Sequence, residues 1–132
     1  MKKVILSISV LAMLGLTSCK NEKKQEQAVE TSKEIVTTDI TFGVRGNCGM
    51  CKKTIENAVN NMDGIANAVW DVDKKKIAVS FDASKTNEIA IHKAIATSGY
   101  DTDKVLSNEE SYKKLPGCCQ YDHEMTMNQV DK

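Results

Sequence analysis

The sequence has no excess of positive charge. Its 18 lysine and arginine residues are matched by 18 aspartate and glutamate residues, so the formal net charge is zero. Binding to nucleic acid requires a basic face that neutralises phosphates, so we expect no nucleic-acid partner. The sequence also lacks paired carboxylates, a nucleophile with its base and a phosphate-binding loop. We therefore expect that the protein is not an enzyme.

Long hydrophobic runs are scarce too. One apolar run, residues 4–16, follows the basic start MKK. It is shorter than the roughly 20 residues of a membrane-spanning helix and suits the centre of a signal peptide. It ends in LTSC, residues 16–19, which resembles the bacterial lipobox. The resemblance implies a bacterial cell-envelope protein, exported and held on the membrane by acyl chains on Cys19. The alternative is an ordinary signal peptide followed by a chance cysteine.

Composition divides the remainder into three parts. Residues 20–34, KNEKKQEQAVETSKE, are charged, lack aromatic side chains and show no apolar period. Such a segment cannot bury enough surface to offset its ordering entropy, so we expect a flexible tether over residues 19–35. Residues 36–106 have the pattern of one small globular domain. Residues 107–132 form a polar tail that contains cysteine, histidine and methionine.

Hydrophobic periodicity predicts six elements in the domain. Alternating apolar residues indicate strands within residues 37–46, 65–72 and 77–81, with a turn over 73–76, and a short last strand over 100–106. Apolar stripes of period 3.6 indicate one helix that ends before Asp63-Gly64 and a second over 86–98. Ser84 or Thr86 is expected to cap the second helix, and His92 to lie on its outer side.

The order of these elements predicts the fold. Strand, helix, strand, strand, helix, strand is the βαββαβ pattern of two split βαβ units. The sequence therefore predicts an α+β, ferredoxin-like sandwich. Its antiparallel sheet would have four strands, with both helices on one face.

A CxxC motif, Cys48 and Cys51, lies between the first strand and the first helix. Thiolates are soft ligands that select ions such as Cu(I) and Hg(II), whereas structural zinc prefers four ligands. Unpaired N–H groups and the dipole at a helix start favour anionic sulfur, and Lys52 and Lys53 add positive charge. The motif therefore indicates a site for a thiophilic metal ion.

The chain resembles the heavy-metal-associated domain family over about residues 37–106. The segments that carry the resemblance are VRGNCGMC, MDGI, VDKKKIAVSFD and AIATSGYD. The resemblance implies that Cys48 and Cys51 are metal ligands and that Tyr100 lies near the metal loop. The loop of the family reads G-M-x-C-x-x-C, and its methionine packs beneath the site. Here Gly46 stands two residues before the first cysteine, and Met50 lies between the cysteines.

Two other interpretations of the CxxC motif remain open. One is thiol–disulfide exchange, because CxxC is also the thioredoxin motif and exported proteins often meet oxidising conditions. The thioredoxin fold, however, uses a proline beside its motif, and the single proline here, Pro116, lies outside the domain. The other interpretation is a structural disulfide between Cys48 and Cys51.

The tail contains a second set of candidate ligands. Adjacent cysteines rarely form an unstrained disulfide with each other, so Cys118 and Cys119 are candidates for metal binding or for pairing elsewhere. Further soft or borderline donors follow at alternate positions: His123, Met125 and Met127. The segment between Leu106 and Cys118 can extend up to ~40 Å, so the tail cysteines can reach the CxxC loop, and we predict that they do. There they would either add a third thiolate to the bound ion or hold a second ion. Docking residues would be Tyr112, Leu115 and Tyr121.

Together these features predict a lipid-anchored metal-binding protein outside the cytoplasm. Cu(I) is the favoured ion, with Hg(II) or Zn(II) as alternatives. The protein would buffer the ion or pass it to a metal transporter or another metal-binding protein.

Overall fold

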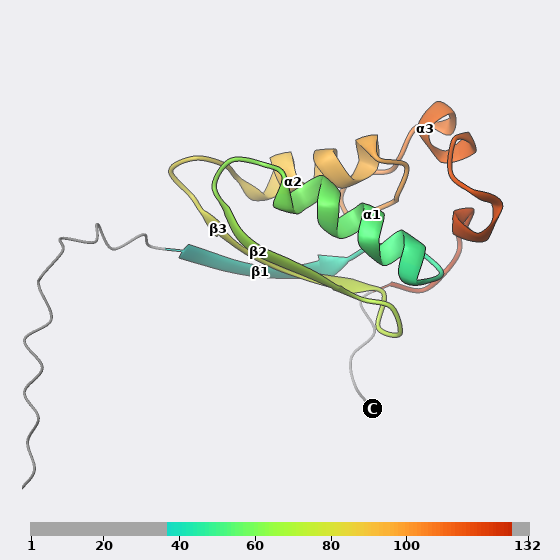
Figure 1. Ribbon diagram of the computed structural model, residues 1–132, viewed down its shortest axis with the longest axis horizontal. Helices are drawn as coiled ribbons and strands as arrows, with labels where there is room; N and C mark the ends of the chain where they lie inside the picture. Colours follow the sequence, from blue (N-terminus) through green and yellow to red (C-terminus); the bar gives the residue numbers. More distant parts are fainter. Residues whose placement is uncertain (1–36, 128–132) are drawn as a thin grey trace, which may run out of the picture. The chain divides into compact units, whose positions relative to one another are not determined.

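A computed structural model describes residues 37–127. Figure 1 shows these residues as a sheet with helices on one side and a C-terminal segment that packs beyond the start of α1. The predicted signal segment, Cys19 and the tether over residues 19–35 lie outside the described residues. These features, and the domain boundaries drawn from them, therefore stay predictions. Within residues 37–127, no helix is both long and apolar enough to cross a bilayer.

The sheet is antiparallel, as predicted. It consists of β1 (Thr37–Gly43), β2 (Ile65–Asp71) and β3 (Lys76–Asp82), in the order β1-β3-β2. Ile77 lies at the centre of a buried row, with Phe42 as its partner on β1 and Trp70 as its partner on β2. Their alternation with exposed neighbours turns one face of the sheet towards the core, where it meets the helices.

Two helices cover that face (Figure 1), α1 (Gly49–Asn60) and α2 (Glu88–Thr97). The predicted apolar stripes are the sides that they bury, because Ile55 and Val59 of α1 and Ile91 and Ile95 of α2 are fully buried. The predicted caps of α2 were wrong. Asn87 is the N-cap residue, and its side chain accepts a hydrogen bond from the N–H of Ala90.

The prediction of a fourth strand was also wrong, since residues 37–127 contain three strands. Segment 100–106 forms only an isolated bridge between Val44 and Thr102. Thr102 explains why pairing stops, because its N–H donates to the carbonyl of Val105 at 2.9 Å and its Oγ1 accepts from the N–H of Val105 at 2.9 Å. The chain therefore turns at the place beside β1 where the outer strand of a βαββαβ sheet would run.

The same turn buries His92, which the helical pattern placed on the outer side of the second helix. The ring is fully buried, 3.8 Å between centroids from Phe42, and its Nδ1 lies 2.7 Å from Thr102 Oγ1. Burial lowers its pKa, against the opposing effect of Asp103. A second side of α2 is thus covered by the loop that replaces the expected strand, so His92 belongs to the core.

The tail continues as α3 (Glu109–Lys113) and the short 3-10 helix η1 (Gly117–Cys119). Leu115 of the tail lies against Gly99, just beyond the end of α2. Leu115 and Tyr121 are buried and Tyr112 is half-buried, so the three predicted docking residues do contact the domain. The Tyr121 hydroxyl accepts from the N–H of Asp101 at 2.8 Å and donates to the carbonyl of Gly99 at 3.0 Å. Residues 107–127 are therefore an integral part of the folded unit.

Candidate metal centre

The CxxC loop places its two sulfur atoms side by side at the start of α1. Cys48 is the N-cap residue and is half-buried, whereas Cys51 lies in the first turn and is fully buried. Their Sγ atoms are 3.6 Å apart. The backbone N–H of Asn47 donates to Cys51 Sγ at 3.3 Å. The loop thus holds one sulfur inside and offers the other to an approaching ion.

The floor of the loop is an indole ring. A Cβ atom on Gly46 would lie 3.0 Å from Cη2 of Trp70 and 3.2 Å from Cβ of Cys51. A methyl group at this position would force the ring or the loop to shift by a few tenths of an ångström, so glycine favours the close approach of the chain to the ring. Trp70 is fixed in turn, because its Nε1–H donates to the buried carbonyl of Val44 at 3.1 Å.

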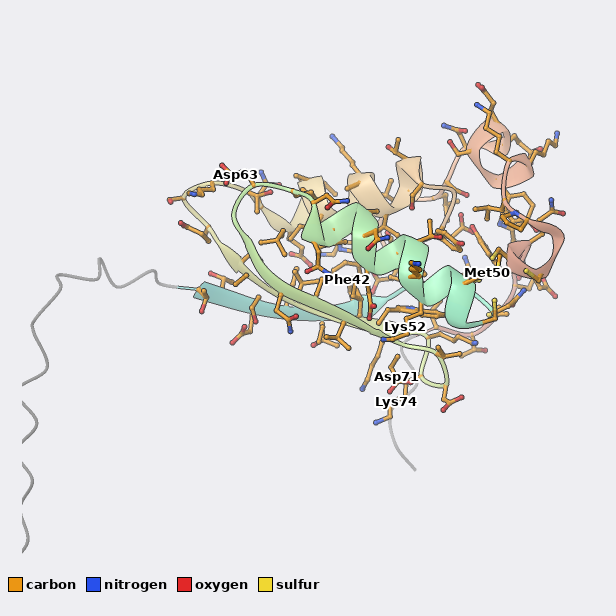
Figure 2. The ribbon with its side chains drawn as sticks, viewed as in Figure 1. Phe42, Met50, Lys52, Asp63, Asp71 and Lys74 are labelled. Carbon is orange, nitrogen blue, oxygen red and sulfur yellow. The ribbon has the colours of Figure 1, made fainter. Side chains whose placement is uncertain are left out.

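Met50 does not pack beneath the site. It lies at the N-terminal end of α1 (Figure 2), and 52% of its surface is exposed. The side chain beneath the loop at Gly46 is instead that of Trp70. Trp70 belongs to the alternating apolar pattern of residues 65–72, but no signal in the sequence connected its ring with Gly46.

The start of α1 acts on the Cys48 thiol. Its sulfur makes no capping hydrogen bond of full geometry. Even so, the nearby N–H groups of Cys51 and Met50, followed by the Cys51 thiol, lower the pKa of Cys48 from 9.0 to about 7. A substantial fraction of Cys48 is therefore thiolate at neutral pH, which is the form that binds metal. This agrees with the effect expected of a helix start.

Lys52 was expected to contribute positive charge to the site, but in the structure its ammonium group binds Glu56 and the backbone of Trp70. Its Nζ donates to Oε1 of Glu56 at 2.5 Å and to the carbonyl of Trp70 at 2.6 Å. Glu56 Oε1 also accepts from the N–H of Trp70 at 2.8 Å. The pair therefore fastens α1 to β2, and so holds the CxxC loop in place above the indole.

The tail cysteines reach the same place. The Sγ atoms of Cys48, Cys118 and Cys119 all lie within 4.8 Å of one another, and those of Cys118 and Cys119 are 3.9 Å apart. The side-chain amide of Asn47 donates to the carbonyls of Cys118 and Gln120, at 3.3 and 3.2 Å. The structure thus shows the predicted return of the tail to the loop. All four cysteines of this region are free.

Two buried residues, Cys119 and Tyr100, lie next to the more accessible thiols of Cys48 and Cys118. Cys119 and Tyr100 are 1% and 0% exposed. Burial, followed by the Cys51 thiol, raises the pKa of Cys119 to about 12, so this sulfur is protonated at neutral pH. Burial also raises the pKa of Tyr100, together with the neighbouring Cys119 and Cys51 thiols. The Tyr100 hydroxyl has no hydrogen-bond partner within residues 37–127. Tyr100, the aromatic residue expected near the metal loop, thus lies beside one cysteine of each pair, Cys51 and Cys119.

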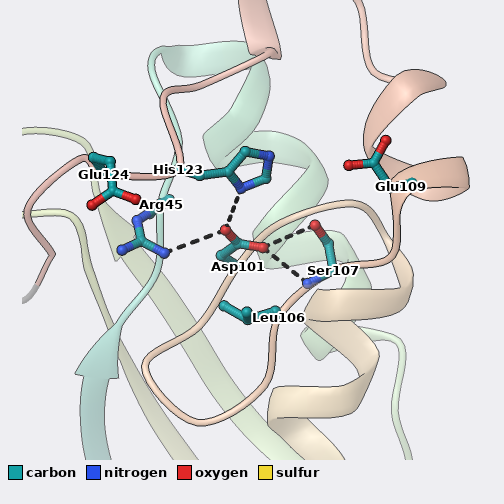
Figure 3. A pocket seen from close by; sticks show the side chains of 7 residues that line it. All are labelled: Arg45, Asp101, Leu106, Ser107, Glu109, His123 and Glu124. Atoms are coloured by element: carbon teal, nitrogen blue, oxygen red, sulfur yellow. Dashed lines mark hydrogen bonds and ion pairs between the residues drawn. The ribbon is translucent and has the colours of Figure 1, made fainter.

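His123 lies elsewhere, in the shallow pocket of Figure 3. Its Nδ1–H donates to Asp101 Oδ2 at 2.7 Å, and Arg45 lies 3.3 Å from the same oxygen. The N–H and hydroxyl of Ser107 both donate to Asp101 Oδ1 at 2.9 Å. Burial by itself would raise the pKa of Asp101, but the hydrogen bonds of His123 and Ser107 outweigh it and lower the pKa. Asp101 thus joins Ser107 and His123 of the tail to the domain.

The two tail methionines are less exposed than a polar tail would suggest. Met125 packs against the core, its carbonyl accepts from Nε of Arg45 at 2.9 Å, and Met127 is half-buried. A ligand role for His123, Met125 and Met127 stays a prediction. The only group of three or more cysteine, histidine or acidic side chains within metal-binding reach in the described part of the chain is the thiol cluster.

Comparison with known proteins points to one family. The model of the heavy-metal-associated domain matches residues 42–101. Copper chaperone CopZ of Staphylococcus aureus is 37% identical over 54 residues, which are 41% of this chain and 79% of that protein. A Bacillus anthracis protein proposed to bind copper ions has a similar structure, with TM-score 0.50 and 26% identity over 52% of this chain and 99% of that one. The structure of oxidized MerP from Ralstonia metallidurans gives a TM-score of 0.49 and 28% identity, over 51% of this chain and 94% of that one. The family match ends before Cys118 and Cys119.

Proposed function

Because the chain belongs to the heavy-metal-associated domain family, we propose that it binds Cu(I) through Cys48 and Cys51 and buffers or transfers the ion. The observation that carries the proposal is the pair of sulfur atoms 3.6 Å apart at the start of α1, one of them with a pKa lowered to about 7. Soft thiolates suit Cu(I) and disfavour hard cations. The protein would act by binding and not as an enzyme.

Transfer requires that a second protein reach the ion. Cys48 is partly exposed, whereas Cys51 is fully buried. A cysteine of a metal transporter or of another metal-binding protein would therefore attack on the Cys48 side, while Cys51 keeps its bond to the ion until exchange is complete. Hg(II) and Zn(II) are the competing cargoes, and Zn(II) is the less suitable of the two for a pair of thiolates, because it prefers four ligands.

A competition experiment tests the cargo. The reduced protein without its first 19 residues should withdraw one Cu(I) from a chromophoric Cu(I) chelator, and excess Zn(II) should not displace it. Met50→Leu is the matched control, because it removes an exposed sulfur between the two cysteines and should leave affinity unchanged. If Cys48→Ser with Cys51→Ser competes as well as the unsubstituted protein, the site is elsewhere. A preference for Zn(II) would reject the copper proposal.

The location is part of the same proposal and is supported by the lipobox-like residues 16–19. Acylation of Cys19 would hold the metal site at the bacterial cell envelope, outside the cytoplasm. Cells grown with labelled palmitate should label the full chain but not its Cys19→Ser variant. Equal labelling of the two, or labelling of neither, would reject the lipid anchor.

A further inference from the structure

Two thiols at the loop have no part in the function proposed so far. Cys118 and Cys119 lie beyond the segment that matches the family, yet their sulfur atoms stand within 4.8 Å of Cys48. Cys48 is thus common to two groups, a pair with Cys51 and a triangle with the tail cysteines. The question is which coordination these separations fit.

Typical metal–sulfur bond lengths show which sulfur–sulfur separations suit linear and trigonal coordination. With metal–sulfur bonds of about 2.3 Å, two sulfurs on opposite sides of a linear ion stand about 4.6 Å apart, and three around a trigonal ion stand about 4.0 Å apart. The distance between the sulfurs of Cys118 and Cys119 is 3.9 Å, and all three sides of the triangle are within 4.8 Å. The separation of 3.6 Å between Cys48 and Cys51 is short for a linear pair. The triangle therefore has separations that suit a trigonal ion, whereas the Cys48–Cys51 pair would have to open by about 1 Å to hold an ion linearly.

The triangle is also held by the fold and does not rest on a free tail. Asn47, the residue before Cys48, binds the carbonyl of Cys118 through its side-chain amide. The N–H of Cys119 donates to the carbonyl of Pro116 at 2.7 Å, which closes the turn that carries both cysteines. Tyr121 anchors the chain just beyond them through its buried hydroxyl. Ligands held in this way lose little entropy when an ion arrives.

We propose that Cys118 and Cys119 complete, together with Cys48, a three-thiolate site for a single Cu(I) ion. The inference rests on the proposed copper function and gives the tail a role in it. Cys48 is the common ligand, so an ion first held by Cys48 and Cys51 moves to the triangle without leaving Cys48. Three thiolates retain the ion more firmly than two, and the tail thereby shifts the protein from rapid transfer towards storage.

X-ray absorption at the copper edge tests the ligand number. The reduced protein over residues 20–132, loaded with one equivalent of Cu(I), should show three sulfur neighbours. Cys118→Ser with Cys119→Ser should show two, and its affinity in chelator competition should fall at least about tenfold, or 1.4 kcal/mol. The matched control is Met125→Leu with Met127→Leu, which removes the other tail sulfurs and should keep three neighbours.

Because Cys119 is buried, its substitution can disturb folding, so Cys118→Ser alone provides a second test at an exposed position. This variant should also lose one sulfur neighbour while its circular dichroism spectrum stays unchanged. Two sulfur neighbours and equal affinity with and without the tail thiols would overturn the triangle and leave the CxxC function standing. Two Cu(I) ions per chain would overturn the single shared ion. Failure of the unsubstituted protein to bind Cu(I) would instead reject the proposed function itself.

Discussion

The two cysteine pairs of this protein offer the same kind of side chain, but different backbone structures carry them. Each pair has one buried and one more exposed member, Cys51 with Cys48 and Cys119 with Cys118. The first pair stands at the start of a helix of 12 residues, whereas the second is carried by a 3-10 turn of three residues. The pKa is about 7 for Cys48 but about 12 for Cys119.

This difference shows that the backbone, and not the presence of a thiol, decides which sulfur is anionic before metal arrives. Unpaired N–H groups at the start of α1 stabilise the Cys48 thiolate, while burial without such donors keeps Cys119 protonated. Metal binding at the second pair must therefore displace a proton. The first pair already offers a thiolate to an incoming metal ion, whereas the second pair loses its proton only when an ion is present.

The largest expected effect concerns thiol reactivity. In the reduced native protein, Cys48 should be alkylated by iodoacetamide with a half-maximal rate near pH 7, because its pKa is about 7. Cys119, with a pKa of about 12 and 1% exposure, should react more than about 1000-fold more slowly at pH 7. Mass spectrometry of timed samples measures both rates. Similar rates for the two would remove the contrast between the pairs.

The next effect is on metal affinity. Cys48→Ser should weaken Cu(I) binding about 100-fold, or 2.7 kcal/mol, because Cys48 belongs both to the pair and to the triangle. Cys118→Ser should weaken it only about tenfold, because the CxxC pair remains. Competition with a chromophoric chelator ranks the two variants. If Cys118→Ser is the more damaging, the tail and not the loop is the principal site.

A smaller effect compares the glycines that precede each pair. Gly46→Ala should lower the free energy of unfolding by about 1–2 kcal/mol, because its Cβ would press on the ring of Trp70 at 3.0 Å. Gly117→Ala has open space around its Cβ and should change the free energy by less than about 0.5 kcal/mol. Urea denaturation measures both. Equal effects would mean that the floor of the CxxC loop yields to the added methyl group.

The smallest effect concerns the attachment of the tail. Asp101 has a lowered pKa, so its contribution to stability is present above its ordinary value of 3.8 and is lost as the pH falls through the folded value. His123 is half-exposed, so His123→Gln should cost at most about 1 kcal/mol at pH 7. The variant should also lose less stability than the unsubstituted protein when the pH falls from 5 to 3. An unchanged pH profile would show that Arg45 and Ser107 alone hold Asp101.

Most of the fold follows from local periodicity, which correctly identified three strands, two helices and their inner faces. It failed at residues 100–106, where the apolar pattern suggested a strand but the side chain and amide of Thr102 turn the chain. The error over His92 has the same origin, because a helix pattern reports one apolar face and cannot reveal a loop that covers a second. Tertiary contacts decided both positions.

The candidate site was predictable to a different degree in its two halves. Spacing and helix position made Cys48 and Cys51 candidate ligands directly. For Cys118 and Cys119 the length of the chain showed only that contact was possible. The contact itself depends on the buried hydroxyl of Tyr121 and the side chain of Asn47, and neither residue has a sequence signal that names its partner. The indole beneath Gly46 was hidden for the same reason.

The 3-10 helix η1, residues 117–119, holds Cys118 and Cys119 beside Cys48, and this affects how other thiols compete for a bound ion. A group tethered by a short flexible linker acts at an effective concentration of about millimolar, and one fixed within 4.8 Å of its target acts at a higher one. An ion on Cys48 therefore meets the thiols of its own chain before those of any free molecule at lower concentration. Small thiols in the surroundings must outnumber this internal competitor before they can strip the ion, and a delivery partner must first displace the turn.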